Sequence, residues 1–220
     1  MNIDTAVQSA SVCLADDDKV LSTAISPTEK ESASWLHVAI QKILQENGVR
    51  PNELNAIAVS AGPGSYTGLR VGMAAAKGLC YALQLPLITV NTLQMMAAAA
   101  EEPATTLLCP MIDARRMEVF TALYNRSLEE VQPSTNLILD ESSFEEWLQQ
   151  NTISFFGNGS TKAATVIQHA NALFISVAAS AADMVSLSAK KFLLHEFDDL
   201  AYTEPHYGKD FHSPISKKFY

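Results

Sequence analysis

The segment from Ser60 to Lys77, SAGPGSYTGLRVGMAAAK, limits the possible folds more than any other part of the chain. Residues 56–60 have the apolar pattern of a buried strand and Thr67 to Leu83 have the pattern of a helix, so a glycine-rich turn joins strand to helix. Backbone N–H groups at such a turn, together with the helix dipole, can hold an anion. The segment is therefore either a phosphate-binding turn or a surface shaped for another protein.

The phosphate-binding alternative has little support from the residues themselves. The P-loop pattern requires a second glycine followed by lysine and then serine or threonine, whereas the fifth and sixth residues after Gly64 are Leu69 and Arg70. The glycine spacing also fails the dinucleotide-binding pattern. A tight structural turn, with Ser65 or Thr67 capping the helix, explains the residues better.

Small residues follow one stripe of this helix. Gly68, Gly72 and Ala76 recur at four-residue spacing, with Ala75 and Gly78 beside them. Because a glycine inside a helix costs about 1 kcal/mol relative to alanine, the stripe indicates that something approaches the helix backbone closely. The neighbour is either the chain's own sheet or a helix of another molecule, with Leu69 and Met73 at the edge of the contact. The residues alone leave both alternatives open.

The order of the other elements predicts an α/β protein. Residues 27–48 carry apolar side chains at helical spacing and end at a glycine, and strands and helices then alternate to about residue 100. Two further helices are expected at 162–171 and 181–195. No linker or low-complexity tract divides the chain.

A short pattern recurs about half a chain apart and predicts a duplicated fold. Ile112-Asp113 repeats Ile3-Asp4, each pair at the end of an apolar strand and before a polar turn and a second strand. A chain of 220 residues has the length for two small lobes. We expect an N-terminal lobe at 1–104, which carries the helices of the Ser60–Lys77 region, and a C-terminal lobe at 105–220.

Composition excludes several classes of function. The net charge is −9 and the 15 Lys and Arg residues are scattered, whereas nucleic-acid binding needs clustered cations. Cys13, Cys80 and Cys109 lie far apart among apolar neighbours and are expected to be reduced core residues of a cytoplasmic protein. We expect neither secretion nor membrane insertion, because the first thirty residues lack a basic region followed by an apolar run.

Candidate catalytic or ligand-binding residues are few. Asp4 and Asp113 each follow a strand, where a carboxylate can hold a metal or orient phosphates, although aspartate is also common in turns. Gly157 and Gly159 form a glycine turn before a helix that could face a nucleotide. The five histidines form no H-x-x-x-H or H-E-x-x-H pattern, and no serine lies in G-x-S-x-G, so a zinc or serine hydrolase is unsupported.

Five stretches together resemble the TsaB family, also called YeaZ. They are IDTA, the helix within 27–48, AIAVSAGPGSYTGLRVGMAAAKGL, PLITVNTLQ and MIDARRMEVFTALY. The resemblance covers most of residues 1–125, with looser agreement over FFGNGSTK and AYTEPHYGKDF. Only three residues precede Asp4, fewer than is usual in the family, so either the start of the chain is shifted or the first strand is short, and a nucleotide contact through Asp4 or Thr5 is less expected.

The resemblance implies a two-lobed fold of the actin, sugar kinase and Hsp70 type (ASKHA), with duplicated ribonuclease H-like lobes. It also implies a cytoplasmic, non-catalytic subunit, once described as an inactive glycoprotease homologue, that supports the metal-bearing TsaD. With the ATPase TsaE, that pair installs N6-threonylcarbamoyladenosine (t6A) in tRNA. The expected partners are TsaD-like and TsaE-like proteins, a second copy of the chain, and tRNA only through the complex, with no membrane.

The resemblance also implies site residues. A helical partner interface is expected from the two N-terminal helices, at Trp35, Leu36, His37, Ile40, Gly68, Leu69, Gly72, Met73, Ala75 and Ala76. A vestigial nucleotide site is expected at Asp4, Thr5, Asp113, Gly157 and Gly159. No metal and no required cofactor are expected, and ATP or ADP would bind weakly in the assembled complex. The alternatives are an ASKHA-type phosphotransferase or ATPase and, from the old family name, a residual peptidase.

Overall fold

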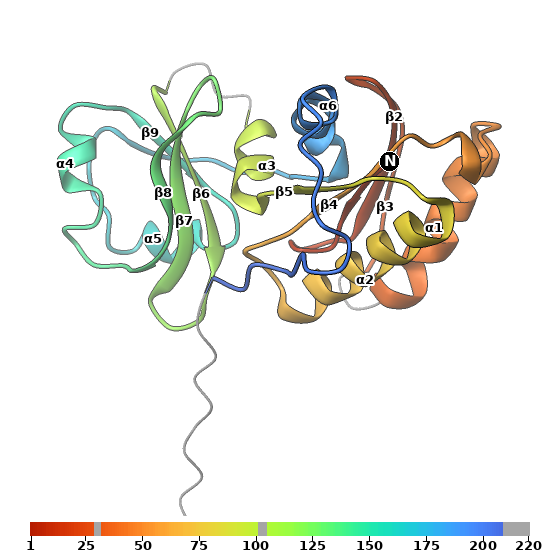
Figure 1. Cartoon of the computed structure of the whole chain (residues 1–220). Coiled ribbons are helices and arrows are strands. Elements are labelled where there is room, and N and C mark those ends of the chain that lie inside the picture. Colours follow the sequence, from red (N-terminus) through yellow and green to blue (C-terminus); the bar gives the residue numbers. More distant parts are fainter. Residues whose placement is uncertain (29–31, 101–104, 209–220) are drawn as a thin grey trace, which may run out of the picture.

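Two five-stranded sheets with the same strand order form the framework of the protein (Figure 1). The computed structural model describes residues 1–28, 32–100 and 105–208. The first sheet has the order β3-β2-β1-β4-β5 and the second the order β10-β9-β6-β7-β8. Read from the other edge, the second sheet repeats the first, and in both the central strand pairs antiparallel on one side and parallel on the other. The predicted two-lobed, duplicated α/β fold is therefore confirmed.

The elements of the first sheet and its helices come from the N-terminal part of the chain. They are β1 (Asn2–Asp4), β2 (Ser11–Asp16), β3 (Lys19–Ile25), α1 (Ser32–Glu46), η1 (Pro51–Glu53), β4 (Ile57–Ser60), α2 (Tyr66–Leu83), β5 (Leu87–Val90) and α3 (Thr92–Ala98). The first strand, β1, is short. Ser65 caps α2, because its hydroxyl accepts a hydrogen bond from the N–H of Gly68.

The second sheet and the last helices follow along the chain. They are β6 (Leu107–Asp113), β7 (Glu118–Asn125), β8 (Glu130–Ile138), α4 (Glu145–Leu148), β9 (Ile153–Phe156), α5 (Ser160–Ala163), β10 (Ala172–Phe174), η2 (Ala181–Met184) and α6 (Val185–Leu193). The helix predicted at 162–171 was wrong beyond its first residues, since α5 ends at Ala163. Thr165, Val166 and Ile167 are β-branched and disfavour a helix, and the chain turns to enter β10.

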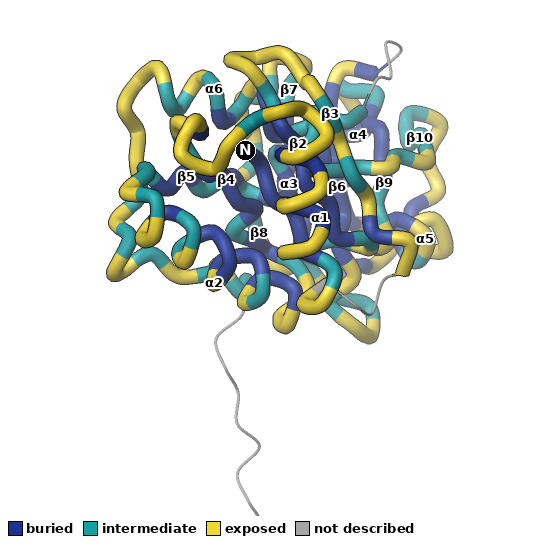
Figure 2. The backbone as a smooth tube through the Cα atoms, turned by 90° about the vertical axis from the view of Figure 1, so that its right-hand side faces the viewer, coloured by how far each residue is buried: buried dark blue, intermediate teal, exposed yellow. Residues whose placement is uncertain are grey.

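The core forms layers around the two sheets. Helices α1 and α2 cover one face of the first sheet, whereas α3 lies between the two sheets and packs on β6 and β7. Figure 2 shows buried backbone concentrated in the middle of the molecule, around β4, α3 and β6. Helices α4 and α5 pack on a third apolar cluster, on the other side of the second sheet.

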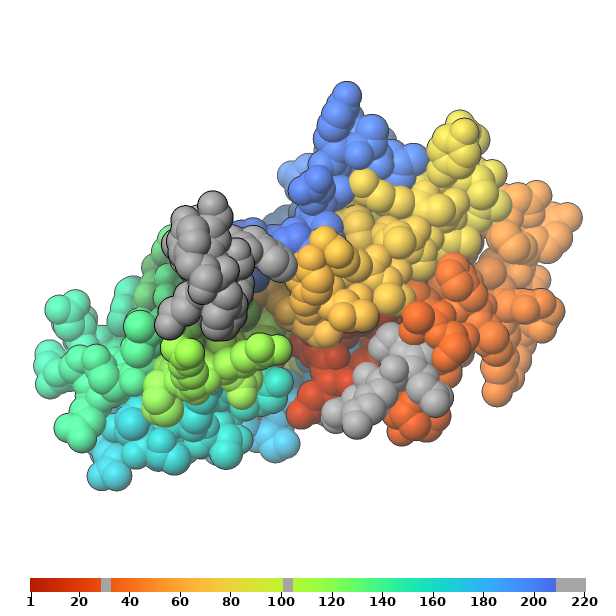
Figure 3. Space-filling model, turned by 90° about the horizontal axis from the view of Figure 1, so that it is seen from below, coloured from red at the N-terminus to blue at the C-terminus, as the bar shows by residue number. Residues whose placement is uncertain are grey.

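The C-terminal part of the chain returns to the first sheet. The N–H of Ala181 donates to the hydroxyl of Ser11, and the hydroxyl of Ser188 donates to the side chain of Asn2. The segment 198–208 then passes along α2, so that α2 lies at the surface between this segment and α1 (Figure 3). The predicted lobe boundary at residue 104 lies in 101–104, outside the described residues.

Candidate functional site

The glycine stripe of α2 faces the end of β1. A Cβ atom added to Gly68 would overlap the carbonyl oxygen of Thr5, and one added to Gly72 would overlap the Thr5 hydroxyl. That hydroxyl donates a hydrogen bond of 2.6 Å to the carbonyl oxygen of Gly68. Of the two alternatives that the sequence left open, the structure supports close internal packing for Gly68 and Gly72, because Thr5 of the same chain occupies the stripe.

Most of the predicted interface residues lie on this internal side. Leu36, Ile40, Gly68, Leu69, Gly72, Met73, Ala75 and Ala76 are buried. Trp35 is half-buried against the core under the first sheet, and His37 is exposed. A contact between these ten residues and a partner stays a prediction. Because most of them are buried, only their exposed neighbours on the two helices are accessible to another molecule.

A groove runs along that exposed side, between α1 and α2. It has a volume of about 480 Å³ and is lined by Ala33, His37, Val71, Ala74, Ala75, Gly78 and Leu79. Apart from its chain neighbours and the backbone of its own helix turns, no described atom lies within 4 Å of the position that a Cβ on Gly78 would take. The sequence placed Gly78 beside the small-residue stripe but not among the expected interface residues, although a glycine within an 18-residue helix is costly in its own right.

The first strand-end aspartate, Asp4, is completely buried. Its Oδ1 atom accepts hydrogen bonds from the hydroxyl of Ser60 (2.5 Å) and the N–H of Ala6 (2.9 Å). Its Oδ2 atom has no partner among the described residues. Burial raises the pKa of Asp4 from 3.8 to about 6, and the nearby charge of Asp183 adds to the increase.

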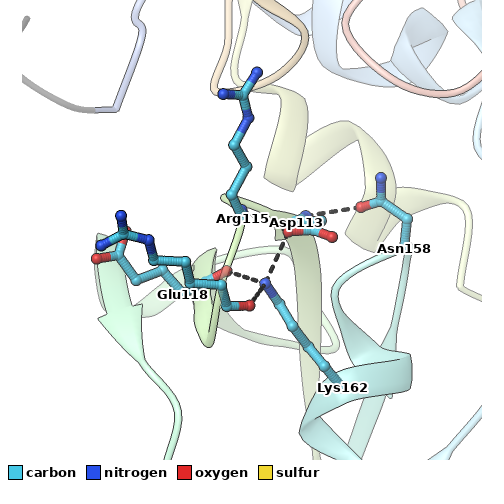
Figure 4. Close-up of polar contacts among 6 residues, drawn as sticks. Asp113, Arg115, Glu118, Asn158 and Lys162 are labelled. Carbon is cyan, nitrogen blue, oxygen red and sulfur yellow. Dashed lines mark hydrogen bonds and ion pairs between the residues drawn. The ribbon is translucent and has the colours of Figure 1, made fainter.

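The second strand-end aspartate, Asp113, lies in different surroundings (Figure 4). Its side chain is 47% exposed, and its Oδ1 atom lies 2.8 Å from Nζ of Lys162. The hydrogen bond from Lys162 lowers the pKa of Asp113. Its backbone N–H donates to Oδ1 of Asn158, and its carboxylate accepts from the N–H of Arg115.

The glycine turn at 157–159 packs on its own chain. A Cβ on Gly157 would overlap Met111 and the tip of Met96, and one on Gly159 would crowd Val119 and Met111. The turn therefore has no room to approach a ligand on that side.

The five predicted nucleotide-site residues divide into two groups. Thr5 lies against the glycines of α2 and Asp4 is bonded to Ser60 at the end of the first sheet, whereas Asp113, Gly157 and Gly159 lie at the end of the second sheet. No hydrogen bond or ion pair recorded within 1–28, 32–100 and 105–208 joins the two groups.

Neither a metal site nor a reactive cysteine is found in the described part of the chain. There, no three His, Cys, Asp or Glu side chains cluster in a way that could hold a metal ion. The three cysteines are free and buried, and burial raises the pKa of Cys80 to about 11 and of Cys109 to about 12, so these two thiols stay protonated at neutral pH. None of the described helices has the length and apolar character needed to span a membrane.

Comparisons with known proteins bear on the same residues. A family model described as "TsaD: tRNA N6-adenosine threonylcarbamoyltransferase" matches residues 20–210. The tRNA threonylcarbamoyladenosine biosynthesis protein TsaB of Bacillus subtilis is 34% identical over 150 residues, which are 67% of this chain and 63% of the relative. The TsaB protein of Escherichia coli is 34% identical over 151 residues, 67% of this chain and 65% of the relative. Each match thus spans just under two thirds of the relative's length.

A solved structure agrees over more of the chain. It is an uncharacterized protein with similarity to peptidase YEAZ from Pseudomonas aeruginosa, with a TM-score of 0.83 and 26% sequence identity. The match covers 94% of this chain and 97% of that one. The similarity therefore includes both sheets.

Proposed function

This chain belongs to the TsaB family, also called YeaZ, and we propose that it is a non-catalytic subunit of the cytoplasmic complex that makes t6A in tRNA. In this proposal it binds a TsaD-like catalytic subunit through the exposed side of α1 and α2. A TsaE-like ATPase joins the pair, and tRNA binds only through the complex.

The observation that carries the proposal is the groove between α1 and α2. Gly78 costs helix stability, about 1 kcal/mol relative to alanine, and none of the described chain approaches it. The groove has small and apolar walls, and exposed Val38 (64%) and Tyr81 (73%) lie on the same two helices. Small residues between two helices let the ridge of a third helix approach closely. The groove thus fits a helix of the partner, or of a second copy of this chain.

Catalysis by this chain itself has less support. A phosphotransferase or ATPase of this fold would need carboxylates from both lobes at one open site, whereas Asp4 is completely buried and Asp113 is paired with Lys162. We propose that the chain needs no cofactor and that ATP or ADP binds weakly and only in the assembled complex. A residual peptidase is not favoured by any arrangement of the described side chains.

The partner surface is tested with Gly78→Leu. The leucine has space in the isolated chain, so the thermal midpoint should stay unchanged or rise, while binding to the purified TsaD-like subunit from the same cell should fall at least tenfold. Ala164→Leu, on an exposed position next to α5, serves as the matched control and should bind normally. Undiminished binding by Gly78→Leu would refute the groove as the interface.

The alternative ATPase is tested by thermal unfolding of the isolated chain with millimolar Mg-ATP. A genuine site at a hundredfold excess over its dissociation constant would stabilise the chain by about 2.7 kcal/mol. We expect no shift. A clear increase in the midpoint that Asp113→Asn removes would favour the phosphotransferase instead.

A further inference from the structure

Two consecutive arginines hold an unusual backbone conformation in the turn between β6 and β7. Arg115 has φ +69° and Arg116 has φ +48°, both in the left-handed region that glycine and asparagine occupy most readily. An ordinary side chain there is disfavoured by its Cβ. The turn is therefore less stable with these two arginines than it would be with asparagine.

Two residues near the start of α5 hold the backbone of this turn in place. Nζ of Lys162 donates to Oδ1 of Asp113 and to the carbonyl oxygens of Arg116 and Glu118, so all three of its protons are used. The side chain of Lys162 is only 16% exposed. Asn158 accepts from the N–H of Asp113 and anchors the start of the turn. The arginine backbone thus rests on a rigid support.

The arginine side chains themselves are left without an ion pair. Both residues are exposed, and neither guanidinium makes an ion pair or hydrogen bond within the described residues. The charge of Asp113 is paired with Lys162, and its carboxylate also accepts the N–H of Arg115. Figure 4 shows the side chain of Arg115 pointing away from Asp113 and Lys162. Two exposed cations therefore stand on a turn whose backbone is held in place, in a chain of net charge −9.

We propose that the Arg115–Arg116 turn is an oxyanion-binding site that takes a single carboxylate or phosphate group. Guanidinium is planar and donates two parallel hydrogen bonds to such groups, which lysine does not. The net charge of the chain opposes a long polyanion such as tRNA, but it opposes a small anion or a short acidic segment much less. The site differs from the groove between α1 and α2, and it does not depend on the function proposed above.

Four versions of the full chain test the site at constant ionic strength. The probes are pyrophosphate and a hexa-aspartate peptide, followed by calorimetric titration and thermal unfolding. The wild type should bind at least one probe, with a rise in thermal midpoint of about 5–10 °C at a hundredfold excess over the dissociation constant. Binding of pyrophosphate identifies a phosphate site, and binding of the peptide alone identifies a carboxylate site. Binding of neither overturns the proposal.

The variants separate charge from backbone strain. Arg115→Gln with Arg116→Gln should weaken binding at least tenfold and leave the midpoint without ligand unchanged. Arg115→Asn with Arg116→Asn should weaken binding equally and raise that midpoint by about 3 °C, because asparagine tolerates the left-handed conformation. Lys19→Gln with Lys42→Gln removes two exposed cations elsewhere and should bind as the wild type does. Equal loss in this control would show general charge attraction and refute the site.

Discussion

Asp4 and Asp113 occupy equivalent places in two sheets of the same design, yet their surroundings are opposite. Each ends the central strand of its sheet, after an isoleucine. Asp4 is completely buried beside Ser60 and its pKa is raised, whereas Asp113 is half-exposed, paired with Lys162, and its pKa is lowered. The duplicated strand order therefore fixes where a carboxylate stands, and the element packed over the strand end decides its charge state.

The difference follows from the two helices that accompany the strand ends. In the first lobe, α2 is 18 residues long and its glycines let it press on Thr5, directly after Asp4. In the second lobe, α5 has only four residues and contributes a lysine instead of a glycine stripe. A long helix thus packs on the residue after Asp4, whereas a single lysine side chain pairs with Asp113.

The largest expected effect is that of Gly72→Leu, which would break the packing over the first strand end. The leucine side chain would collide with Thr5 in a core that has no room to move, so we expect a loss of at least about 4 kcal/mol in the free energy of unfolding. Urea unfolding followed by circular dichroism measures it. A native-like transition would show that α2 can move away from β1. Gly78→Leu, on the outer side of the same helix, provides the control, because the same substitution there meets no neighbour.

Asp4→Asn tests the buried carboxylate. The folded pKa of Asp4, about 6, lies above its usual value of 3.8, so the folded chain binds more protons and loses stability as the pH rises through 6. The ionised form costs about 3 kcal/mol above that pH. The variant should be more stable than the wild type at pH 8 by about 2 kcal/mol, and less pH-dependent between pH 4 and 7. Equal pH profiles from denaturant titrations would contradict the burial argument.

Lys162→Met tests the other strand end. It removes the partner of Asp113 and two hydrogen bonds to the turn, and we expect a loss of about 1–2 kcal/mol after allowance for solvent screening of the exposed carboxylate. Because pairing lowers the pKa of Asp113, the contribution of the pair is present above pH 4 and lost as the pH falls further. NMR titration of Asp113 should show a higher pKa in the variant. An unchanged value would mean that Lys162 does not neutralise it.

The smallest expected effect is a gain. Gly78→Ala should raise the free energy of unfolding of the isolated chain by about 1 kcal/mol, because alanine favours the helix and its Cβ meets nothing. Differential scanning calorimetry of the two chains provides the measurement. A decrease would reveal a neighbour of Gly78 in solution, such as a second copy of the chain.

Local signals predicted much of the fold. The capping serine, the small-residue helix and the alternation of elements placed β4, α2 and β5 correctly, and the repeated Ile-Asp pattern indicated the duplication. Shorter or more exposed elements were missed. β8 alternates between partly buried and exposed residues and has a proline, and β10 has three residues, so neither has a clear apolar period. The helix expected at 162–171 ends at Ala163, because the β-branched Thr165, Val166 and Ile167 that follow disfavour a helix.

The amino-acid sequence by itself determined which residues are small, charged or apolar, and through their spacing it determined the helices, the central strands and the family. Only the tertiary structure decided that Gly72 faces Thr5 while Gly78 faces the groove between α1 and α2. The same holds for Lys162, which meets Asp113 across 49 residues of sequence. Periodicity identifies the faces of a helix, but the contact that covers each face comes from distant parts of the chain. The charge of a carboxylate then depends on those tertiary contacts, because burial raises its pKa and pairing with a cation lowers it.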